Sequence, residues 1–517
     1  MTIKQSVVFV TILFLQAIPS GLNSIGYSLE HEAIERWGVY ELCIEGSVSG
    51  NPYLDVSFTA SFANGGQSTS VPGFYDGDGL YKIRFSPDRL GEWSYTTQSN
   101  RPELHGRAGS FSCVNPSGNN HGPLAIVNTY YLEYADGTPF YSVGTTAYQW
   151  TSVKQSIQEQ TINTLANAPF NKIRMCFFPK WYQYGNKTEP WDYPFAEKND
   201  FSHPNYIFFQ NFDKRIRQLL DLGIQADVIL FHPYDNWGYA AMGKANNERF
   251  VRYMIARLSA YRNVWWSLAN EWDIPKIKET IDWEGIGALL RNEDPHQRFR
   301  GIHNWYDSED HFYDHSRPWI THTCTQTSQF YNAIKWRNQY RKPLLFDEMR
   351  YEGDVPSGWG NLSGQEMASY FWMAGLSGGY GTHGDTFQNT SDDSTEVRWW
   401  AKGGLLDGNS PSRIAFFRSF MEMLPVKEMK PALNDNGNPK NLNNNVYSFS
   451  KDGEIYLAYV ADADVEIRFQ LAGDQPYQMN VIDTWNMKSL LKEDFRPGEF
   501  RYTTKNKYEA ICLSVHK

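Results

Sequence analysis

The sequence has few cysteines, no block of basic charge and a single long apolar run. Its 517 residues include five cysteines, Cys43, Cys113, Cys176, Cys324 and Cys512. This odd, scattered set forms neither a disulfide framework nor a CxxC metal pattern, and only a pairing of Cys43 with Cys113 is left open. Lys and Arg number 48 against 58 Asp and Glu, a net charge of −10 spread along the chain. Nucleic acid and anionic membrane surfaces are therefore not expected as partners.

The apolar run lies near the start of the chain, from Val7 to Leu15, between a short segment with one lysine and a group of small residues. This arrangement predicts a secretory signal peptide over residues 1–24, with a buried strand or helix as the alternative. No cysteine follows the run, so a lipoprotein anchor is not expected. No stretch elsewhere reaches the roughly 18 apolar residues of a membrane-spanning helix. We therefore predict a secreted or periplasmic protein without a membrane span.

Aromatic residues are abundant: 18 Trp, 32 Tyr and 31 Phe make up 16% of the chain. Together with 41% hydrophobic and 21% charged residues, they exclude a mainly disordered protein. At about 100–200 residues per domain, the length predicts two to four domains. Aromatic side chains fill cores, and they also line clefts that take flat, hydroxylated ligands. Composition alone does not separate these two uses.

Both ends of the chain show a β pattern. Residues 27–117 contain short runs of alternating polarity, such as 39–44 and 80–85, between clusters of Gly, Asn, Pro and Asp, and they predict an immunoglobulin-like β-sandwich. Within it, residues 73–79 predict a hairpin turn, because the spacing of an EF-hand calcium loop is missing. Residues 432–517 predict a second β-sandwich, which begins with an Asn-rich boundary loop over residues 434–445.

Between these segments, residues 122–428 alternate apolar β-runs with helical periodicity. This pattern predicts the α/β fold class and a (β/α)8 TIM barrel. A doubly wound sheet is the alternative, but no GxGxxG or Walker loop follows the first strand. The predicted strands are residues 140–145, 172–177, 226–231, 264–269, 300–304, 319–323, 343–346 and 379–382.

Acidic residues stand at the C-terminal ends of two predicted strands, where barrel active sites lie. Asn270 and Glu271 follow the fourth strand, and Glu348 follows the seventh. Two carboxylates that face each other across the barrel mouth are the acid and the nucleophile of a retaining glycosidase. Taken singly, Glu271 is also explained as a helix N-terminal acid and Glu348 as a surface ion-pair partner. Together they predict a catalytic pair.

Neighbouring side chains supply reasons for a division of labour between the two acids. Asn270 is expected to donate to the sugar 2-hydroxyl. Arg174, near the end of the second strand, is expected to keep Glu348 ionised. Trp272, with Trp266, is expected to exclude water and raise the pKa of the acid.

Other residues near the strand ends are weaker candidates for the substrate cleft, and packing in a core or a loop is the alternative for each. They are Tyr148, Trp150 and Trp400 as stacking surfaces, and His303, Asn304, Trp305, Gln326 and His383 as lining residues.

Two further acids and a set of histidines suggest rival sites. Asp347 and Glu352 are rival nucleophiles, but strand alternation directs Asp347 towards the helices and Glu352 lies further out on the loop. A metal site is an alternative, because four histidines lie near strand ends: His232, His303, His322 and His383. The His-x-His expected after strand one of a metal-dependent barrel hydrolase is missing, so we predict no metal.

The barrel resembles clan A of the retaining glycoside hydrolases, in which an Asn-Glu pair ends strand four and a Glu ends strand seven. The resemblance implies that Glu271 is the acid/base, Glu348 the nucleophile and Asn270 the 2-hydroxyl contact. It also implies that Arg174 and His232, which end strands two and three, support the site. One departure is the absence of the clan's His-x-Tyr pattern from residues 320–325, which leaves open the residue that orients the nucleophile.

A closer resemblance is to apiosidase-like barrel proteins of Bacteroides-type glycan-degrading systems, which join an N-terminal β-sandwich to the barrel and a C-terminal β-domain. The segments that carry it are residues 71–79 (VPGFYDGDG), 91–95 (GEWSY), 120–123 (NHGP) and 136–140 (DGTPF).

The sequence thus predicts a secreted retaining glycosidase that acts on a polysaccharide or oligosaccharide and needs no cofactor. Two alternatives remain: a carbohydrate-binding protein with a degenerate barrel, and a carbohydrate esterase, which would need a serine nucleophile that no GxSxG motif supplies in the barrel. The sugar, the linkage, endo or exo cleavage and the oligomeric state are left open. They depend on loops such as residues 179–199 and 388–396.

Overall fold

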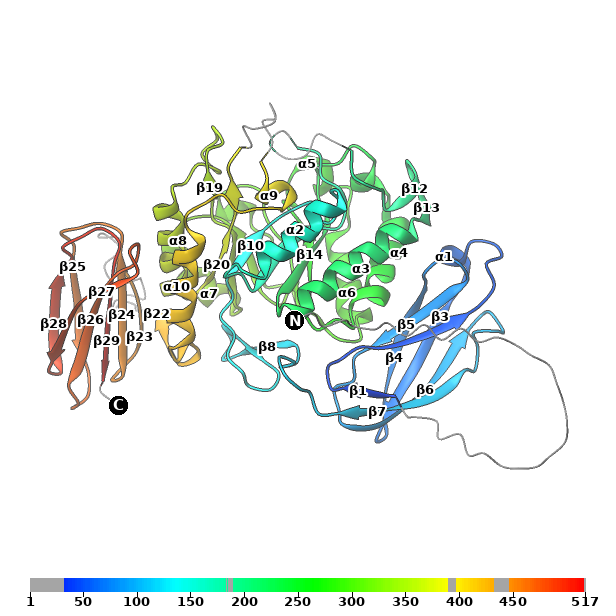
Figure 1. Cartoon of the computed structure of the whole chain (residues 1–517), viewed down its shortest axis with the longest axis horizontal. Coiled ribbons are helices and arrows are strands. Elements are labelled where there is room, and N and C mark those ends of the chain that lie inside the picture. The colour runs from blue at the N-terminus through cyan, green and yellow to red at the C-terminus, as the bar shows by residue number, and fades with distance from the viewer. Residues whose placement is uncertain (1–31, 183, 185–188, 389–396, 432–445, 516–517) are drawn as a thin grey trace, which may run out of the picture.

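The computed structural model describes residues 32–182, 184, 189–388, 397–431 and 446–515. A central α/β body lies between an N-terminal and a C-terminal β-domain (Figure 1). The predicted signal peptide, the boundary loop over residues 434–445 and nearly all of the loop over residues 388–396 lie outside the described residues.

Eight parallel strands form the sheet of the central body, as the sequence predicts. They are β10 (Gly144–Thr146), β11 (Lys172–Cys176), β14 (Gln225–Phe231), β15 (Val264–Ala269), β16 (Arg300–Gly301), β17 (Thr323–Gln326), β18 (Leu344–Glu348) and β20 (Tyr380–His383). Their order, β16-β15-β14-β11-β10-β20-β18-β17, is that of a barrel in which consecutive strands are neighbours. The ring is closed where the amide of Thr321, just before β17, donates to the carbonyl of Arg300 at 2.9 Å.

Helices surround the barrel (Figure 1) and bury their apolar sides against it. Three helices have side-chain N-caps: Asn205 accepts from the amide of Phe208, Asp282 from that of Gly285, and Ser363 forms a capping box with Glu366. The helices are α2 (Gln155–Leu165), α3 (Tyr206–Asp221), α4 (Lys244–Leu258), α5 (Pro275–Lys278), α6 (Trp283–Glu293), α7 (Ala333–Tyr340), α8 (Gly364–Leu376), α9 (Trp399–Lys402) and α10 (Pro411–Glu422), with short 3-10 turns η1 (Tyr239–Ala241), η2 (Glu309–His311), η3 (Phe330–Asn332) and η5 (Val426–Glu428).

The sequence placed two barrel strands too early: strand one begins at Gly144 and not at Phe140, and strand six is displaced almost entirely. The apolar residues Trp319 and Ile320 suggested a strand over residues 319–323, but the strand is β17 (Thr323–Gln326). The amide of Ile320 instead closes a turn onto the carbonyl of Arg317, and the indole of Trp319 donates to Glu284 of α6. The apolar pair is therefore buried against a helix, and a more polar sequence forms the strand.

The N-terminal domain is all-β apart from one short helix. Its sheet order is β1-β7-β6-β3-β4-β5-β2, and the predicted hairpin turn lies between β4 and β5, where the amide of Leu80 donates to the carbonyl of Gly77. Cys43 and Cys113 are both free thiols, which resolves the open question of their pairing. The elements are β1 (Ala33–Glu35), β2 (Tyr40–Glu45), α1 (Pro52–Asp55), β3 (Phe58–Asn64), β4 (Gln67–Tyr75), β5 (Leu80–Phe85), β6 (Gly91–Ser99) and β7 (Ala108–Val114).

A buried ion network joins this domain to the barrel. Arg84 of β5 lies 2.7 Å from Asp213 of α3, and Arg257 of α4 lies 2.6 Å from the same aspartate. Arg257 also lies 2.7 Å from Asp76, in the turn after β4. All four side chains are almost fully buried. Because each buried charge has a partner, removal of one member would leave an uncompensated charge, and the network helps to fix the position of the domain.

The C-terminal domain has a sheet in the order β22-β23-β24-β29-β26-β27 and a separate β25-β28 pair. Tyr459 of β24 stacks on Trp372 of the barrel helix α8 at 5.6 Å between ring centroids, and its hydroxyl donates to Ser369 at 2.7 Å. The strands are β22 (Lys430–Pro431), β23 (Tyr447–Lys451), β24 (Ile455–Val460), β25 (Glu466–Leu471), β26 (Tyr477–Asp483), β27 (Lys488–Phe495), β28 (Gly498–Thr503) and β29 (Glu509–Val515).

Short paired strands decorate the barrel: β8 (Leu124–Val127) with β9 (Tyr131–Tyr134), β12 (Phe195–Glu197) with β13 (Asp200–Pro204), and β19 (Glu352–Gly353) with β21 (Asp385–Thr386). No helix in the described part of the chain is both long and apolar enough to cross a membrane.

Candidate active site

A cavity of about 460 Å³ opens at the C-terminal ends of the barrel strands. Both predicted catalytic acids, Glu271 and Glu348, line it. Each lining residue lies at or beyond the end of a barrel strand, which is where this fold places its chemistry. The other lining residues are Tyr148, Lys180, Tyr182, Tyr234, Trp305, Gln326, Tyr351, Trp359 and Trp400.

Glu271 is held in an unusual backbone conformation just after β15. Its φ of 57° lies in the left-handed region, which is unfavourable for a residue with a side chain and is often found at functional sites. The flanking amides fix the turn: that of Asn270 donates to the carbonyl of Phe231, and that of Trp272 donates to the carbonyl of His303 at 2.9 Å. These bonds turn the Glu271 side chain into the cavity.

The environment of Glu271 favours its protonated form. The carboxyl group is buried, which raises its pKa, and the negative charge of Glu348 raises the pKa further, to about 8. The Tyr234 hydroxyl, which donates to Oε2, and the Lys180 charge oppose this rise only in part. Near neutral pH, Glu271 is therefore a carboxylic acid with a proton to give.

The environment of Glu348, the last residue of β18, favours its ionised form. Burial alone would raise its pKa, but the hydrogen bond from His303, the positive charge of Arg174 and the hydrogen bond from the Tyr148 hydroxyl outweigh burial and lower the pKa to about 2. His303 Nε2 and Arg174 Nη1 lie 3.4 Å and 3.3 Å from Glu348 Oε1, and Tyr148 donates to the same oxygen. His303, after strand five, thus contacts Glu348, whereas the sequence left open which residue at strand six would do so.

Asn270 is tied to the same group of side chains. Its Oδ1 accepts from the Tyr148 hydroxyl at 3.0 Å and lies 3.3 Å from Arg174 Nη2. Its Nδ2 is buried and has no hydrogen-bond partner among the described residues. A buried donor without a partner is costly, so this amide is placed to donate to a bound ligand.

Strand alternation predicted that Asp347 points towards the helices, and the structure contradicts this prediction. It is buried and lies 2.8 Å from Lys172, which also lies 2.7 Å from Asp227. These residues form an ion cluster with Arg174 inside the barrel. The register between β17 and β18 shifts at Thr325 and Gln326, so regular alternation ends before Glu348. The side chains of Asp347 and Glu348 therefore both lie on the inner side of the strand end. Asp347 forms an ion pair with Lys172 beneath the cavity.

Glu352, the other rival nucleophile, is buried away from the cavity. Its carboxylate accepts from the amides of Asn409 at 2.7 Å and Ser410 at 3.2 Å, at the start of α10. His383 Nε2 lies 3.9 Å from it. The residue therefore holds a helix start and a loop together.

The predicted substrate-binding residues fall into three groups. Trp305 and Gln326 line the cavity. Arg174, Asn270 and His303 lie directly behind the cavity. Arg174 donates to Glu348 and to Asn270, and His303 bonds to Gln326. The remaining five lie outside it: Trp150, His232, Trp272, Asn304 and His383.

Those five residues serve the packing of the barrel instead. Trp150 is fully buried in the main apolar core, and Trp272 packs edge-on against Tyr313 with ring centroids 4.9 Å apart. The expectation that Trp272, with Trp266, excludes water and so raises the pKa of Glu271 stays a prediction. His232 Nε2 bonds to the carbonyl of Phe178 at 3.0 Å. The last two residues bond to neighbouring segments: Asn304 accepts from the amide of Gln326, and His383 lies 3.2 Å from the Thr145 hydroxyl.

The sequence reasoning missed five cavity residues: Lys180, Tyr182, Tyr234, Tyr351 and Trp359. Each lies within about a dozen residues of a predicted strand end, so position alone was a usable signal. Attention to carboxylates and histidines passed over one lysine and three tyrosines, and Trp359 lies furthest from a predicted strand end. Tyr148 and Trp400, named only as weaker stacking candidates, also line the cavity.

A second cavity of about 540 Å³ adjoins the first and shares Gln326, Glu348, Tyr351 and Trp359 with it. Its own lining includes Asp307 and Arg350. The two cavities therefore share a wall that includes Glu348.

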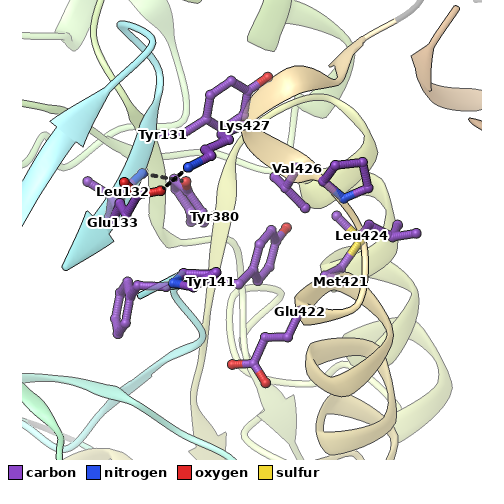
Figure 2. Close-up of a pocket in the computed structure, with 13 residues that line it drawn as sticks. Tyr131, Leu132, Glu133, Tyr141, Tyr380, Met421, Glu422, Leu424, Val426 and Lys427 are labelled. Atoms are coloured by element: carbon purple, nitrogen blue, oxygen red, sulfur yellow. Dashed lines mark hydrogen bonds and ion pairs between the residues drawn. The ribbon is translucent and has the colours of Figure 1, made fainter. Parts of the chain in front are cut away.

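A different cavity, of about 470 Å³, lies between the β8-β9 pair and α10 (Figure 2). The rings of Tyr141 and Tyr380 and the side chains of Met421 and Val426 line it, and Lys427 pairs with Glu133 at its edge. The tyrosines pack against each other and against α10. The two acids that line the cavity are each paired with a cation, Glu133 with Lys427 and Glu422 with Arg418.

The histidines that raised a metal alternative are dispersed over separate contacts. In the residues that the structure describes, no group of three or more His, Cys, Asp and Glu side chains is arranged to hold a metal ion.

Comparison with known proteins places this barrel among the folds of glycoside hydrolases. A glycoside hydrolase family 5 structure from Bacteroides vulgatus covers 76% of this chain and 94% of its own, with a TM-score of 0.60 and 14% identity, and so shares the fold. A second crystal structure from Bacteroides vulgatus, of a protein classed provisionally as a glycoside hydrolase, is 33% identical over 94% of this chain and 100% of its own, with a TM-score of 0.84. No curated protein matches the chain.

The family model for the apiosidase-like catalytic domain matches residues 127–428. The chain therefore belongs to the apiosidase-like family. Residues 33–100 match a further family, a domain of unknown function (DUF5060). The family and the fold together support a glycosidase function, and the resemblance inferred from residues 71–79 and the barrel acids is confirmed at the level of the family.

Proposed function

We propose that this protein is a secreted retaining glycosidase in which Glu348 is the nucleophile and Glu271 the acid/base. One observation carries the proposal: two buried glutamates line the same cavity, and their surroundings move their pKa values in opposite directions, to about 8 and about 2. A protonated acid beside an ionised carboxylate is the pairing that glycosidic bond cleavage needs.

The reaction follows in two displacements. Glu348 Oε attacks the anomeric carbon while Glu271 gives its proton to the glycosidic oxygen, so the bond to the leaving sugar breaks as the ester to Glu348 forms. In the second step Glu271, now ionised, takes a proton from water, whose oxygen attacks the anomeric carbon and releases Glu348. Both residues return to their starting protonation states, and the mechanism needs no cofactor.

The residues around the pair keep the two roles separate. Arg174, His303 and Tyr148 surround Glu348 Oε1, so they hold the nucleophile ionised and oriented. The unpartnered Nδ2 of Asn270 is placed for a sugar hydroxyl. Trp305, Trp359 and Trp400 offer rings on which sugar faces stack.

We also infer that the two flanking β-domains are sandwiches whose role is to brace the barrel. The Arg84–Asp213 contact on one side and the stacking of Tyr459 on Trp372 on the other support this role. The predicted export signal over residues 1–24 makes an extracellular or periplasmic glycan the expected substrate.

The proposal predicts the pH dependence of catalysis. Glu271 must be protonated and Glu348 ionised, so kcat/KM should be bell-shaped, with a basic limb near pH 8 and an acidic limb that lies near pH 2 unless unfolding comes first. A screen of polysaccharides and aryl glycosides supplies the substrate, and initial rates between about pH 1.5 and 10 give the profile. His303→Ala removes the hydrogen bond that lowers the Glu348 pKa, so its acidic limb should move to higher pH.

Three results would count against this assignment. They are a basic limb below pH 6, an unchanged acidic limb in His303→Ala, and release of acetate in place of reducing sugar, which would favour the esterase alternative.

A further inference from the structure

Lys180 is a cation inside the catalytic cavity, and in the part of the chain that the structure describes no carboxylate lies within ion-pairing distance of it. The residue follows β11, lines the cavity and is 4% exposed. Its ammonium lies over four aromatic rings, at 3.7 Å from the ring centre of Tyr148, 4.6 Å from Tyr234, 4.8 Å from Trp400 and 5.4 Å from Tyr182. Cation–π contacts stabilise a positive charge but accept none of its hydrogen bonds in the way that an oxygen does.

The other buried cations of the barrel interior differ from Lys180 in this respect. Lys172 lies within 2.8 Å of both Asp227 and Asp347, and Arg174 lies 3.3 Å from Glu348. Among the described residues, no carboxylate lies within 4.0 Å of Lys180 Nζ and no group accepts a hydrogen bond from it. Burial accordingly lowers the pKa of Lys180. A buried ammonium with unused donors is costly unless a ligand supplies the acceptor.

The Lys180 ammonium lies where its charge would act on the charge of the reacting sugar. The two nearest rings belong to Tyr148 and Tyr234, whose hydroxyls donate to Glu348 and Glu271 respectively. Lys180 therefore lies between the supports of the nucleophile and of the acid. The transition state of glycoside cleavage carries positive charge on the sugar. An uncompensated ammonium at this position opposes that charge, whereas an ammonium neutralised by an anion on the substrate does not.

We propose that the cavity binds an acidic sugar, whose anionic substituent, a carboxylate or a sulfate ester, pairs with the Lys180 ammonium. The pair would be charge-assisted and shielded from water by the four rings, which makes it a determinant of substrate class. This inference rests on the proposed glycosidase function and specifies the sugars on which that function acts.

The test compares matched aryl glycosides of one hexose in three forms: the neutral sugar, its uronic acid and its 6-sulfate. The wild-type protein should prefer at least one acidic form in kcat/KM. Lys180→Met keeps the length of the side chain but removes the charge, and it should lower kcat/KM on that form by about 10- to 100-fold, the usual value of a hydrogen bond to a charged group. On the neutral sugar kcat/KM should not fall, because the variant removes an ammonium that opposes the positive charge of the transition state. The acidic form that loses more identifies the anion as carboxylate or sulfate.

Lys278→Met serves as the matched control, because Lys278 contacts the Trp272 ring at 5.6 Å outside the cavity and should leave both activities unchanged. Equal losses on neutral and acidic substrates in Lys180→Met, or a wild-type preference for the neutral form, would overturn the proposal. If no glycoside is cleaved, the proposed function fails, and calorimetry with the free uronic acid, the sulfated sugar and the neutral sugar still decides the role of Lys180. Binding of an acidic sugar that Lys180→Met abolishes supports the pairing, and equal binding of all three sugars contradicts it.

Discussion

Replacement of Glu348 by Ala is expected to reduce kcat by at least about 10⁴-fold, since loss of a nucleophile removes the covalent route altogether. The structure gives the physical reason. Arg174, His303 and Tyr148 all converge on Oε1 of this carboxylate, and no other ionised acid among the described residues lines the cavity. Steady-state kinetics on the best substrate from the screen measures the loss.

Two further variants separate chemistry from folding. Glu348→Gln keeps the shape of the side chain and acceptance by one oxygen, and it should be as inactive as the Ala variant while it unfolds at a temperature close to that of the wild type. Glu293→Ala removes an exposed glutamate that pairs with Arg252 and should retain full activity. If Glu348→Ala turned over substrate at a rate near that of the wild type, the assignment of the nucleophile would be wrong.

Replacement of Glu271 by Ala is expected to have an effect that depends on the leaving group. General acid catalysis contributes about 10²- to 10⁴-fold, so kcat/KM on a natural linkage should fall by that amount. An aryl glycoside with a dinitrophenolate leaving group needs no proton, and its kcat/KM should fall far less. Because the second displacement then lacks its base, the glycosyl ester on Glu348 should accumulate and appear as a burst of released phenolate.

Azide provides the decisive addition to this experiment. As an anion it attacks the glycosyl ester without help from a base, so it should restore the turnover of Glu271→Ala on the activated substrate and yield a glycosyl azide of retained configuration. Equal losses on the natural and the activated substrate, with no effect of azide, would mean that Glu271 only positions other groups.

The sequence allowed the two glutamates of the cavity to be located, because their positions depend on strand ends. Glu271 and Glu348 come directly after apolar runs that read clearly as strands β15 and β18, and the topology of the barrel then brings their side chains to one cavity. The family resemblance sharpened the interpretation at these positions.

The parts that could not be predicted depend on tertiary packing. Alternation directed Asp347 outwards, but the register shift between β17 and β18 and the buried Lys172 hold it inside. Trp150 follows strand one, yet the apolar core encloses it completely. His303 lies two residues beyond β16 and reaches Glu348 from strand five, and no local pattern encodes that direction.

The aromatic residues also divide in a way that composition could not reveal. Most of the tryptophans fill the core of the barrel, whereas tyrosines provide much of the cavity wall. Their hydroxyls donate to both acids, as those of Tyr148 and Tyr234 do. That aromatic rings stack on the sugar therefore stays a prediction for Trp305, Trp359 and Trp400. The tyrosines in addition influence the protonation of the two glutamates.

Covalent labelling tests the two-glutamate mechanism most directly. A panel of 2-deoxy-2-fluoro glycosyl fluorides, which form the glycosyl ester readily and release it slowly, is incubated with the wild-type protein and with Glu348→Ala, followed by intact mass and peptide mapping. We expect the wild-type protein to gain the mass of one fluorosugar on Glu348 and the variant to gain none. A label on any other residue, or turnover of the natural substrate with inversion of configuration, would contradict the mechanism.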